Sequence, residues 1–150
     1  MRIHKPLLAL FALGLAAGQV LANDCEVEIA GDDMMKFSKT EITVPSSCEE
    51  VKLTLTHSGK LPVNAMGHNW VLAETANWRE IAQSGQTAGL EKEYLPDDKG
   101  AIIAYTELVG GGESTTITFD LSDLDKSTEY TYFCSFPGHW VQMNGKFIIE

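Results

Sequence analysis

Residues 51–57, VKLTLTH, alternate apolar and polar side chains without a break, and this pattern constrains the fold more than any other feature of the chain. Successive side chains of a β-strand point to opposite faces of its sheet. The valine and the two leucines would therefore share one face, and the lysine and the two threonines the other. The segment predicts a strand with one face in the core and one in water.

Seven further segments have short strand-like patterns and are bounded by turn-forming residues. They are CEVEIA (25–30), SKTEITVP (38–45), NWVLA (69–73), AIIAYTEL (101–108), GGGESTTITFDL (110–121), TEYTYFC (128–134) and GKFIIE (145–150). About eight strands without repeating strand–helix units predict an all-β fold, either a sandwich or a barrel.

Residues 74–96 interrupt this pattern. Trp78, Ile81 and Ala82 have helical spacing, with Thr75 or Asn77 as a start signal and Gly85 as a stop. We expect a short helical excursion between two strands, the alternative being an irregular flap.

The N-terminus resembles a secretory signal. Arg2 and Lys5 precede an apolar run at 7–18, and residues 20–22 end on a small side chain. The run is short for a membrane span, so cleavage after Ala22 is favoured over an uncleaved anchor. Residues 23–150 would then form a single domain in the periplasm, without a membrane span.

The charge of that domain limits its partners. Without Arg2 and Lys5, 9 basic residues face 21 acidic ones, a net charge of −12. This excess argues against binding to nucleic acid or to an anionic membrane surface. A solvated acidic surface explains it, and a basic protein partner is compatible with it.

The chain has three cysteines, so an oxidising compartment would leave one of them unpaired. Three different disulfides are possible among these cysteines. Cys25 and Cys48 lie at segment ends without a nearby histidine or methionine, whereas Cys134 has both close by. We therefore predict a Cys25–Cys48 disulfide and a free Cys134, for which an ordinary buried thiol is the alternative.

Cys134, His139 and Met143 lie on one short connection between two predicted strands. Such a connection brings its ends together, so the three donors would converge. Thiolate, imidazole and thioether together suit copper, whereas zinc favours a closed set of strong ligands. A Cys–His nucleophile is a third interpretation, but it needs an open pocket and an orienting side chain.

A copper site of this kind needs a second imidazole, and His57 and His68 are the candidates downstream of residue 22. Gly67 next to His68 leaves room for a close backbone approach. We therefore expect His68 to be the ligand and His57 a structural residue.

The motifs MGHNWVL (66–72) and FCSFPGHWVQM (133–143) together resemble the cupredoxins, and within them the azurin branch. The similarity extends over essentially all of residues 23–150. It implies a Greek-key β-sandwich and one type 1 copper ion cycling between Cu(II) and Cu(I). His68, Cys134 and His139 would form a trigonal set of ligands, with Met143 and the Gly67 carbonyl as weak axial ligands.

The resemblance also implies supporting roles. Asn69 would connect the ligand loops, and the Phe136 N–H would donate toward the Cys134 sulfur. It implies the same Cys25–Cys48 disulfide, and it places Trp70 in the core. Protonation of His57 would make the reduction potential modestly pH-dependent.

By the same resemblance the protein would be a monomeric electron carrier and no enzyme, with electrons passing through His139. Its partners would be transient redox proteins such as c-type cytochromes or a periplasmic reductase. The expected docking patch consists of Met35, Leu61, Ala65, Met66, Phe136, Pro137 and Trp140. Trp140 and Gln142 depart from the small or aliphatic residues usual in azurins, and we expect them to alter partner choice. Copper storage or delivery is the alternative function.

Overall fold

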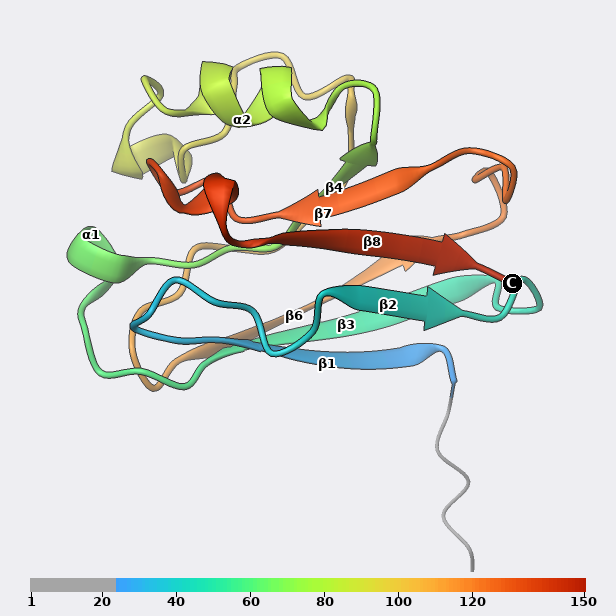
Figure 1. The fold of residues 1–150 in the computed structure, drawn as a ribbon, viewed down its shortest axis with the longest axis horizontal. Coiled ribbons are helices and arrows are strands. Elements are labelled where there is room, and N and C mark those ends of the chain that lie inside the picture. Colours follow the sequence, from blue (N-terminus) through green and yellow to red (C-terminus); the bar gives the residue numbers. More distant parts are fainter. Residues whose placement is uncertain (1–23) are drawn as a thin grey trace, which may run out of the picture.

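The computed structural model describes residues 24–150, and the predicted signal segment and its cleavage site lie outside them. The described chain forms two β-sheets packed face to face, with one helix on the outside (Figure 1). The prediction of an all-β sandwich with a short helical excursion is confirmed.

The first sheet has the strand order β1-β3-β6. Its strands are β1 (Glu26–Gly31), β3 (Glu50–His57) and β6 (Ser114–Asp120). β1 runs parallel to β3, and β6 runs antiparallel to it. Each apolar residue of the 51–57 alternation is fully buried, as its spacing predicts.

The second sheet has the order β2-β8-β7-β4-β5. Its strands are β2 (Glu41–Val44), β4 (Val71–Glu74), β5 (Ile102–Tyr105), β7 (Tyr130–Phe133) and β8 (Asn144–Ile149). β2 pairs in parallel with β8, and the other pairs are antiparallel. The chain thus passes from β1 in one sheet to β2 in the other and back to β3, which ties the sheets together.

The core between the sheets centres on Trp70, which has no exposed surface. Its ring lies 5.8 Å from the ring of Phe119 and 5.9 Å from that of Tyr132, distances at which aromatic pairs attract each other. The Trp70 Nε1 has no hydrogen-bond partner among residues 24–150, so this side chain contributes through packing alone.

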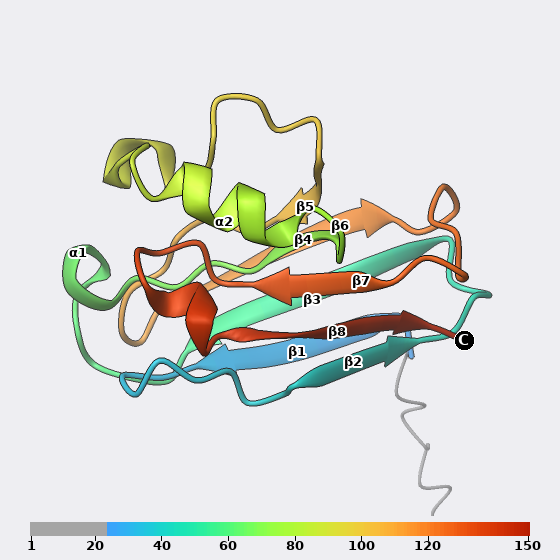
Figure 2. The ribbon, with the colours of Figure 1, turned by 45° about the horizontal axis from the view of Figure 1, so that its top comes forward.

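Helix α2 (Trp78–Gly85) covers the outer face of the five-stranded sheet (Figure 2). Trp78, Ile81 and Ala82 pack on that face, where Val71 and Phe133 form the floor. This explains why β4 and β7 are buried on both faces and have no polar alternation. The predicted helix is therefore present, with Asn77 at its start.

Three shorter helical segments lie in connections: α1 (Val63–Met66), η1 (Leu90–Lys92) and η2 (His139–Val141). Among the helices of residues 24–150, none combines the length and the apolar character that crossing a bilayer requires.

Candidate metal centre

The connection between β7 and β8 carries the three sulfur and imidazole donors predicted from the sequence. Cys134 follows β7 directly, His139 opens η2, and Met143 immediately precedes β8. The backbone N–H of Cys134 donates to the Met143 carbonyl at 3.0 Å, and that of Met143 donates to the His139 carbonyl at 2.8 Å. These bonds fold the connection into a tight turn with its ends side by side.

Glycine shapes this turn at one point. Gly138 has φ = 81°, in the left-handed region that residues with a Cβ rarely adopt. It sits immediately before His139 and starts η2. The Pro-Gly sequence thereby sets the direction in which the imidazole leaves the backbone.

His68 comes from a different part of the chain, between α1 and β4. Its backbone exchanges two hydrogen bonds of 2.9 Å with Val109, which fixes the segment as a short antiparallel bridge. Its ring Nε2 lies 2.8 Å from the Asp32 carbonyl oxygen. A carbonyl only accepts hydrogen bonds, so Nε2 carries the proton and Nδ1 keeps its free lone pair.

The three donors converge. The Cys134 Sγ lies 3.9 Å from the His68 Nδ1 and 3.7 Å from the His139 Nδ1. Among the described residues these three form a buried group whose ligand atoms are all within 4.8 Å of one another. Bonds of about 2.0 Å to nitrogen and 2.3 Å to sulfur, spread at roughly 110–120°, would separate a sulfur donor from a nitrogen donor by about 3.5–3.7 Å. The spacing therefore fits one shared metal ion.

The remaining predicted ligands lie next to this group. The Gly67 carbonyl oxygen is 3.9 Å from the Cys134 Sγ. Met143 is fully buried in one apolar cluster with Cys134 and Phe136. A trigonal set of two histidines and one cysteine with a weak methionine ligand is typical of blue-copper sites, so the donor chemistry fits copper.

Burial sets the protonation states of the metal-free donors. It lowers the pKa of His139 to about 4, with the neighbouring His68 and His57 acting in the same direction. Burial also lowers the pKa of His68. Both imidazoles are therefore neutral at pH 7 and able to bind a metal.

Burial shifts the pKa of the Cys134 thiol in the opposite direction. Burial raises the pKa of Cys134 to about 12, although hydrogen bonds from the backbone N–H groups of Asn69 and Phe136 oppose this shift. Without a metal Cys134 is thus a neutral thiol. An incoming ion must displace its proton, and the two N–H groups are then in place to stabilise the thiolate.

Asn69 connects the two ligand-bearing segments. Its Oδ1 accepts from the Ser135 backbone N–H at 2.8 Å, and its Nδ2 donates to the Ser135 Oγ at 2.7 Å. The residues next to His68 and Cys134 are thereby joined directly, the role that the resemblance implied for Asn69.

His57 is fully buried, and its ring stacks on that of His68 at 4.3 Å. Its Nε2 donates to the Met66 carbonyl at 2.8 Å, and its Nδ1 accepts from the Gly59 N–H at 3.0 Å. His57 therefore supports the ligand ring from behind. The expected pH dependence of the potential stays a prediction.

Gly31 is a contributor that the sequence analysis did not identify. A Cβ at this position would lie 2.6 Å from the His68 Cδ2 and 3.2 Å from the Met143 Cε. The absence of a side chain at the end of β1 thus makes room for two of the donor residues. Only the tertiary contact reveals this, because in sequence Gly31 is an ordinary strand end.

The residues of the expected docking patch lie in the connections at one end of the sandwich, the end where α1 is located (Figure 1). Leu61 is 41 % exposed, and Ala65 and Pro137 are also exposed. Phe136 is buried, with its ring 4.5 Å from that of His139. Trp140 is half-buried and packs edge-on against Trp78 of α2 at 5.9 Å, so part of its ring faces the helix.

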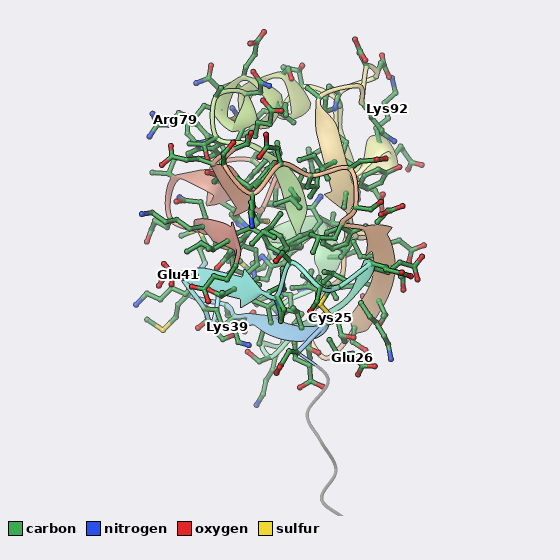
Figure 3. The ribbon with its side chains drawn as sticks, turned by 90° about the vertical axis from the view of Figure 1, so that its right-hand side faces the viewer. Cys25, Glu26, Lys39, Glu41, Arg79 and Lys92 are labelled. Carbon is green, nitrogen blue, oxygen red and sulfur yellow. A yellow bond between two sulfur atoms is a disulfide. The ribbon has the colours of Figure 1, made fainter. Side chains whose placement is uncertain are left out.

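The predicted Cys25–Cys48 disulfide is present, and Cys134 is the one free cysteine of the described chain. The bridge lies at the opposite end of the sandwich, which faces the viewer in Figure 3, where Cys25 is labelled.

Comparison with known proteins gives consistent matches. The family model described as copper binding proteins, plastocyanin/azurin family, matches residues 23–150. An azurin from Pseudomonas aeruginosa is 41 % identical over 146 residues, 97 % of this chain and 99 % of the relative. Azurin-1 from Alcaligenes xylosoxydans xylosoxydans is 48 % identical over 122 residues, 81 % of this chain and 95 % of the relative. The solved structure of an azurin from the obligate methylotroph Methylomonas sp. strain J matches with a TM-score of 0.80 and 42 % identity, covering 85 % of this chain and 99 % of that one.

Proposed function

Since this chain belongs to the plastocyanin/azurin family of copper-binding proteins, we propose that it is a periplasmic carrier of single electrons. The observation that carries the proposal is the buried convergence of His68, Cys134 and His139, with sulfur–nitrogen distances of 3.7 and 3.9 Å. When bound, copper supplies a one-electron couple between Cu(II) and Cu(I).

The protein's contribution is a fixed and dry set of ligands. His68 is held by the Asp32 carbonyl and by the stacked His57 ring, and Cys134 by its backbone hydrogen bond to Met143. Donors locked by their surroundings change little when the charge at the site changes. Gly67 and Met143 would complete the ligand set.

His139 is the proposed point of electron exchange. It is 3 % exposed, whereas His68, Cys134 and Met143 are 0 % exposed. The exposed Leu61, Ala65 and Pro137 around this end, with Met35, Met66, Phe136 and Trp140, form the proposed docking patch. A small apolar patch suits brief encounters with redox proteins such as c-type cytochromes or a periplasmic reductase.

The same geometry disfavours catalysis by a Cys–His pair. A nucleophilic cysteine needs a lowered pKa and access to substrate, whereas Cys134 is fully buried with its pKa raised to about 12. Storage or delivery of copper is also disfavoured, because exchange of the ion would require these buried ligands to open.

Spectroscopy of the copper-loaded chain tests the proposal. We expect one copper per chain, an intense thiolate-to-copper absorption, and fast electron exchange with a small redox protein. Cys134→Ser should remove the absorption. A colourless copper-loaded protein whose Cys134 is still alkylated by a thiol reagent would contradict the proposal. Readily exchanged copper with slow electron transfer would favour storage instead.

A further inference from the structure

Residues Glu93 and Tyr94 have an unusual backbone for side chains of their size. Both adopt positive φ, at 56° and 55°. Such a conformation is unfavourable for a residue with a side chain and persists only where the surroundings fix it. The turn lies in the excursion between α2 and β5, about 25 residues along the chain from His68 and 40 from Cys134.

The backbone carbonyl of Glu93 reaches the junction of the ligand loops. It accepts from the Asn69 Nδ2 at 3.2 Å and from the Ser135 Oγ at 3.2 Å. Asn69 follows His68, and Ser135 follows Cys134. One carbonyl oxygen therefore meets both residues that join the two ligand-bearing segments.

The carboxylate of Glu93 holds a third segment. Its Oε1 accepts from the Leu108 backbone N–H at 3.0 Å. Leu108 precedes Val109, whose backbone is paired with His68. The Leu108 side chain also packs on the cluster of Cys134, Phe136 and Met143.

The next residue adds an aromatic contact in the same direction. The Tyr94 ring meets the Phe136 ring edge-on at 5.0 Å, and Phe136 lies 4.5 Å from the His139 ring. The left-handed turn at 93–94 thus contacts three of the segments that surround the metal donors: the one after His68, the one after Cys134, and the one that carries Leu108.

We propose that Glu93 is a positioning residue of the metal centre. Its carboxylate fixes the 108–109 segment, its carbonyl fixes the Asn69–Ser135 junction, and together they set the separation of His68 and Cys134. This inference rests on the proposed copper-binding function, and it gives the excursion a role in the centre besides covering the sheet.

Three substitutions of Glu93 distinguish the contribution of its side chain from that of its backbone conformation. Glu93→Gln keeps an oxygen acceptor at the same position. Glu93→Ala removes the acceptor and keeps the strained φ. Glu93→Gly also removes the acceptor but adopts positive φ freely, so it preserves the turn if the alanine variant folds poorly. Glu91→Ala is the matched control, because Glu91 is an exposed residue of the same segment.

We expect Glu93→Ala and Glu93→Gly to weaken copper binding by about tenfold or more, as loss of a partner behind metal ligands does in general. The copper hyperfine splitting in paramagnetic resonance and the reduction potential should shift with the affinity. Glu93→Gln and Glu91→Ala should stay close to the parent protein. In the metal-free protein, the Leu108 amide should exchange its hydrogen faster in the alanine and glycine variants.

Parent-like copper affinity, hyperfine splitting and potential in both truncated variants would overturn the positioning role, even if their melting temperatures fell. Failure of the proposed function has a different signature, because the parent protein itself would then lack the thiolate-to-copper absorption.

Discussion

At the scale of single residues, the centre depends on small groups as much as on its donors. The Asp32 carbonyl decides which nitrogen of His68 is free, and the missing side chain of Gly31 makes room for that ring. Neither group is a ligand. Donor geometry of this kind is set by neighbours that fix each ring in one orientation.

Gly31→Ala should therefore weaken the metal centre. The added Cβ would lie 2.6 Å from the His68 Cδ2, closer than atoms pack, so the ring must shift. We expect a stability loss of about 1–3 kcal/mol from overpacking and an altered thiolate-to-copper band in a copper titration. Gly100→Ala is the control, since its Cβ would meet only an oxygen of the Asp98 carboxylate, at 3.2 Å. An unchanged spectrum for Gly31→Ala would show that the close approach is dispensable.

At the scale of elements, α2 packs against the connection between β7 and β8 that carries His139. Trp78 of α2 packs against Phe133 at the end of β7 and against Trp140 in η2. The Trp140 Nε1 is buried without a hydrogen-bond partner in the described chain, so this ring contributes by packing. The helix thereby supports the turn that carries His139.

Trp140→Ser should loosen this connection. We expect the free energy of unfolding to fall by about 1–3 kcal/mol, because a half-buried aromatic contact is lost. Val141→Ser in the same turn should change it little, since Val141 is 63 % exposed. Thermal unfolding of the metal-free variants measures both effects, and equal losses in the two would contradict the role of the Trp78 contact.

Partner choice is a separate prediction for this turn. Trp140→Ser and Gln142→Leu should change the relative electron-transfer rates across a panel of redox proteins, because Trp140 belongs to the proposed docking patch and Gln142 lies in the same connection. Rates that stay unchanged for every partner would show that neither Trp140 nor Gln142 affects docking.

Two turns before β7 predict how stability depends on pH. The Asp120 carboxylate accepts from the Ser122 Oγ and N–H, and the Asp125 carboxylate accepts from the Ser127 N–H and Oγ. These hydrogen bonds hold the pKa of both carboxyl groups below their usual range. A carboxyl group with a lowered pKa stabilises the fold above its unfolded pKa and loses that contribution as pH falls.

Asp120→Asn with Asp125→Asn should therefore be less stable than the parent at pH 7, and the difference should shrink as the pH falls below about 4. Denaturant unfolding of the metal-free proteins at several pH values measures it. A difference that stays constant over this range would mean that the carboxylate charges do not contribute.

At the scale of the whole molecule, the sandwich separates its covalent bridge from its metal centre. The donors lie in connections at one end, and Cys25 lies at the other (Figures 1 and 3). The disulfide joins residues 23 positions apart in sequence, at the start of β1 and just before β3. It therefore restricts the conformations of the unfolded chain without contacting the donors.

Replacing Cys25 and Cys48 together by alanine should lower the free energy of unfolding by about 3 kcal/mol on the chain-entropy model. The thiolate-to-copper absorption should be retained, because the centre is at the far end. Loss of that absorption in a variant that is still folded would show that the two ends are coupled.

Much of the fold and of the candidate site could be predicted from residues that are close together in the sequence. The alternation in β3 placed its apolar residues in the core, and the helical spacing of Trp78, Ile81 and Ala82 located α2. The donors of the β7–β8 connection were predictable because both ends of one short peptide must meet. These features depend on residues that are close in sequence, where strand and helix periods impose the geometry.

The contributions of Gly31, Asp32, Glu93 and the Trp78–Trp140 contact could not be predicted in this way. Each acts on the centre across a separation of many residues, and nothing in its own segment indicates its partner. The sequence by itself therefore determined the type of fold, the disulfide and the chemistry of the donors. Only the tertiary structure decided which neighbours hold those donors, because that depends on how the loops pack together once both sheets have formed.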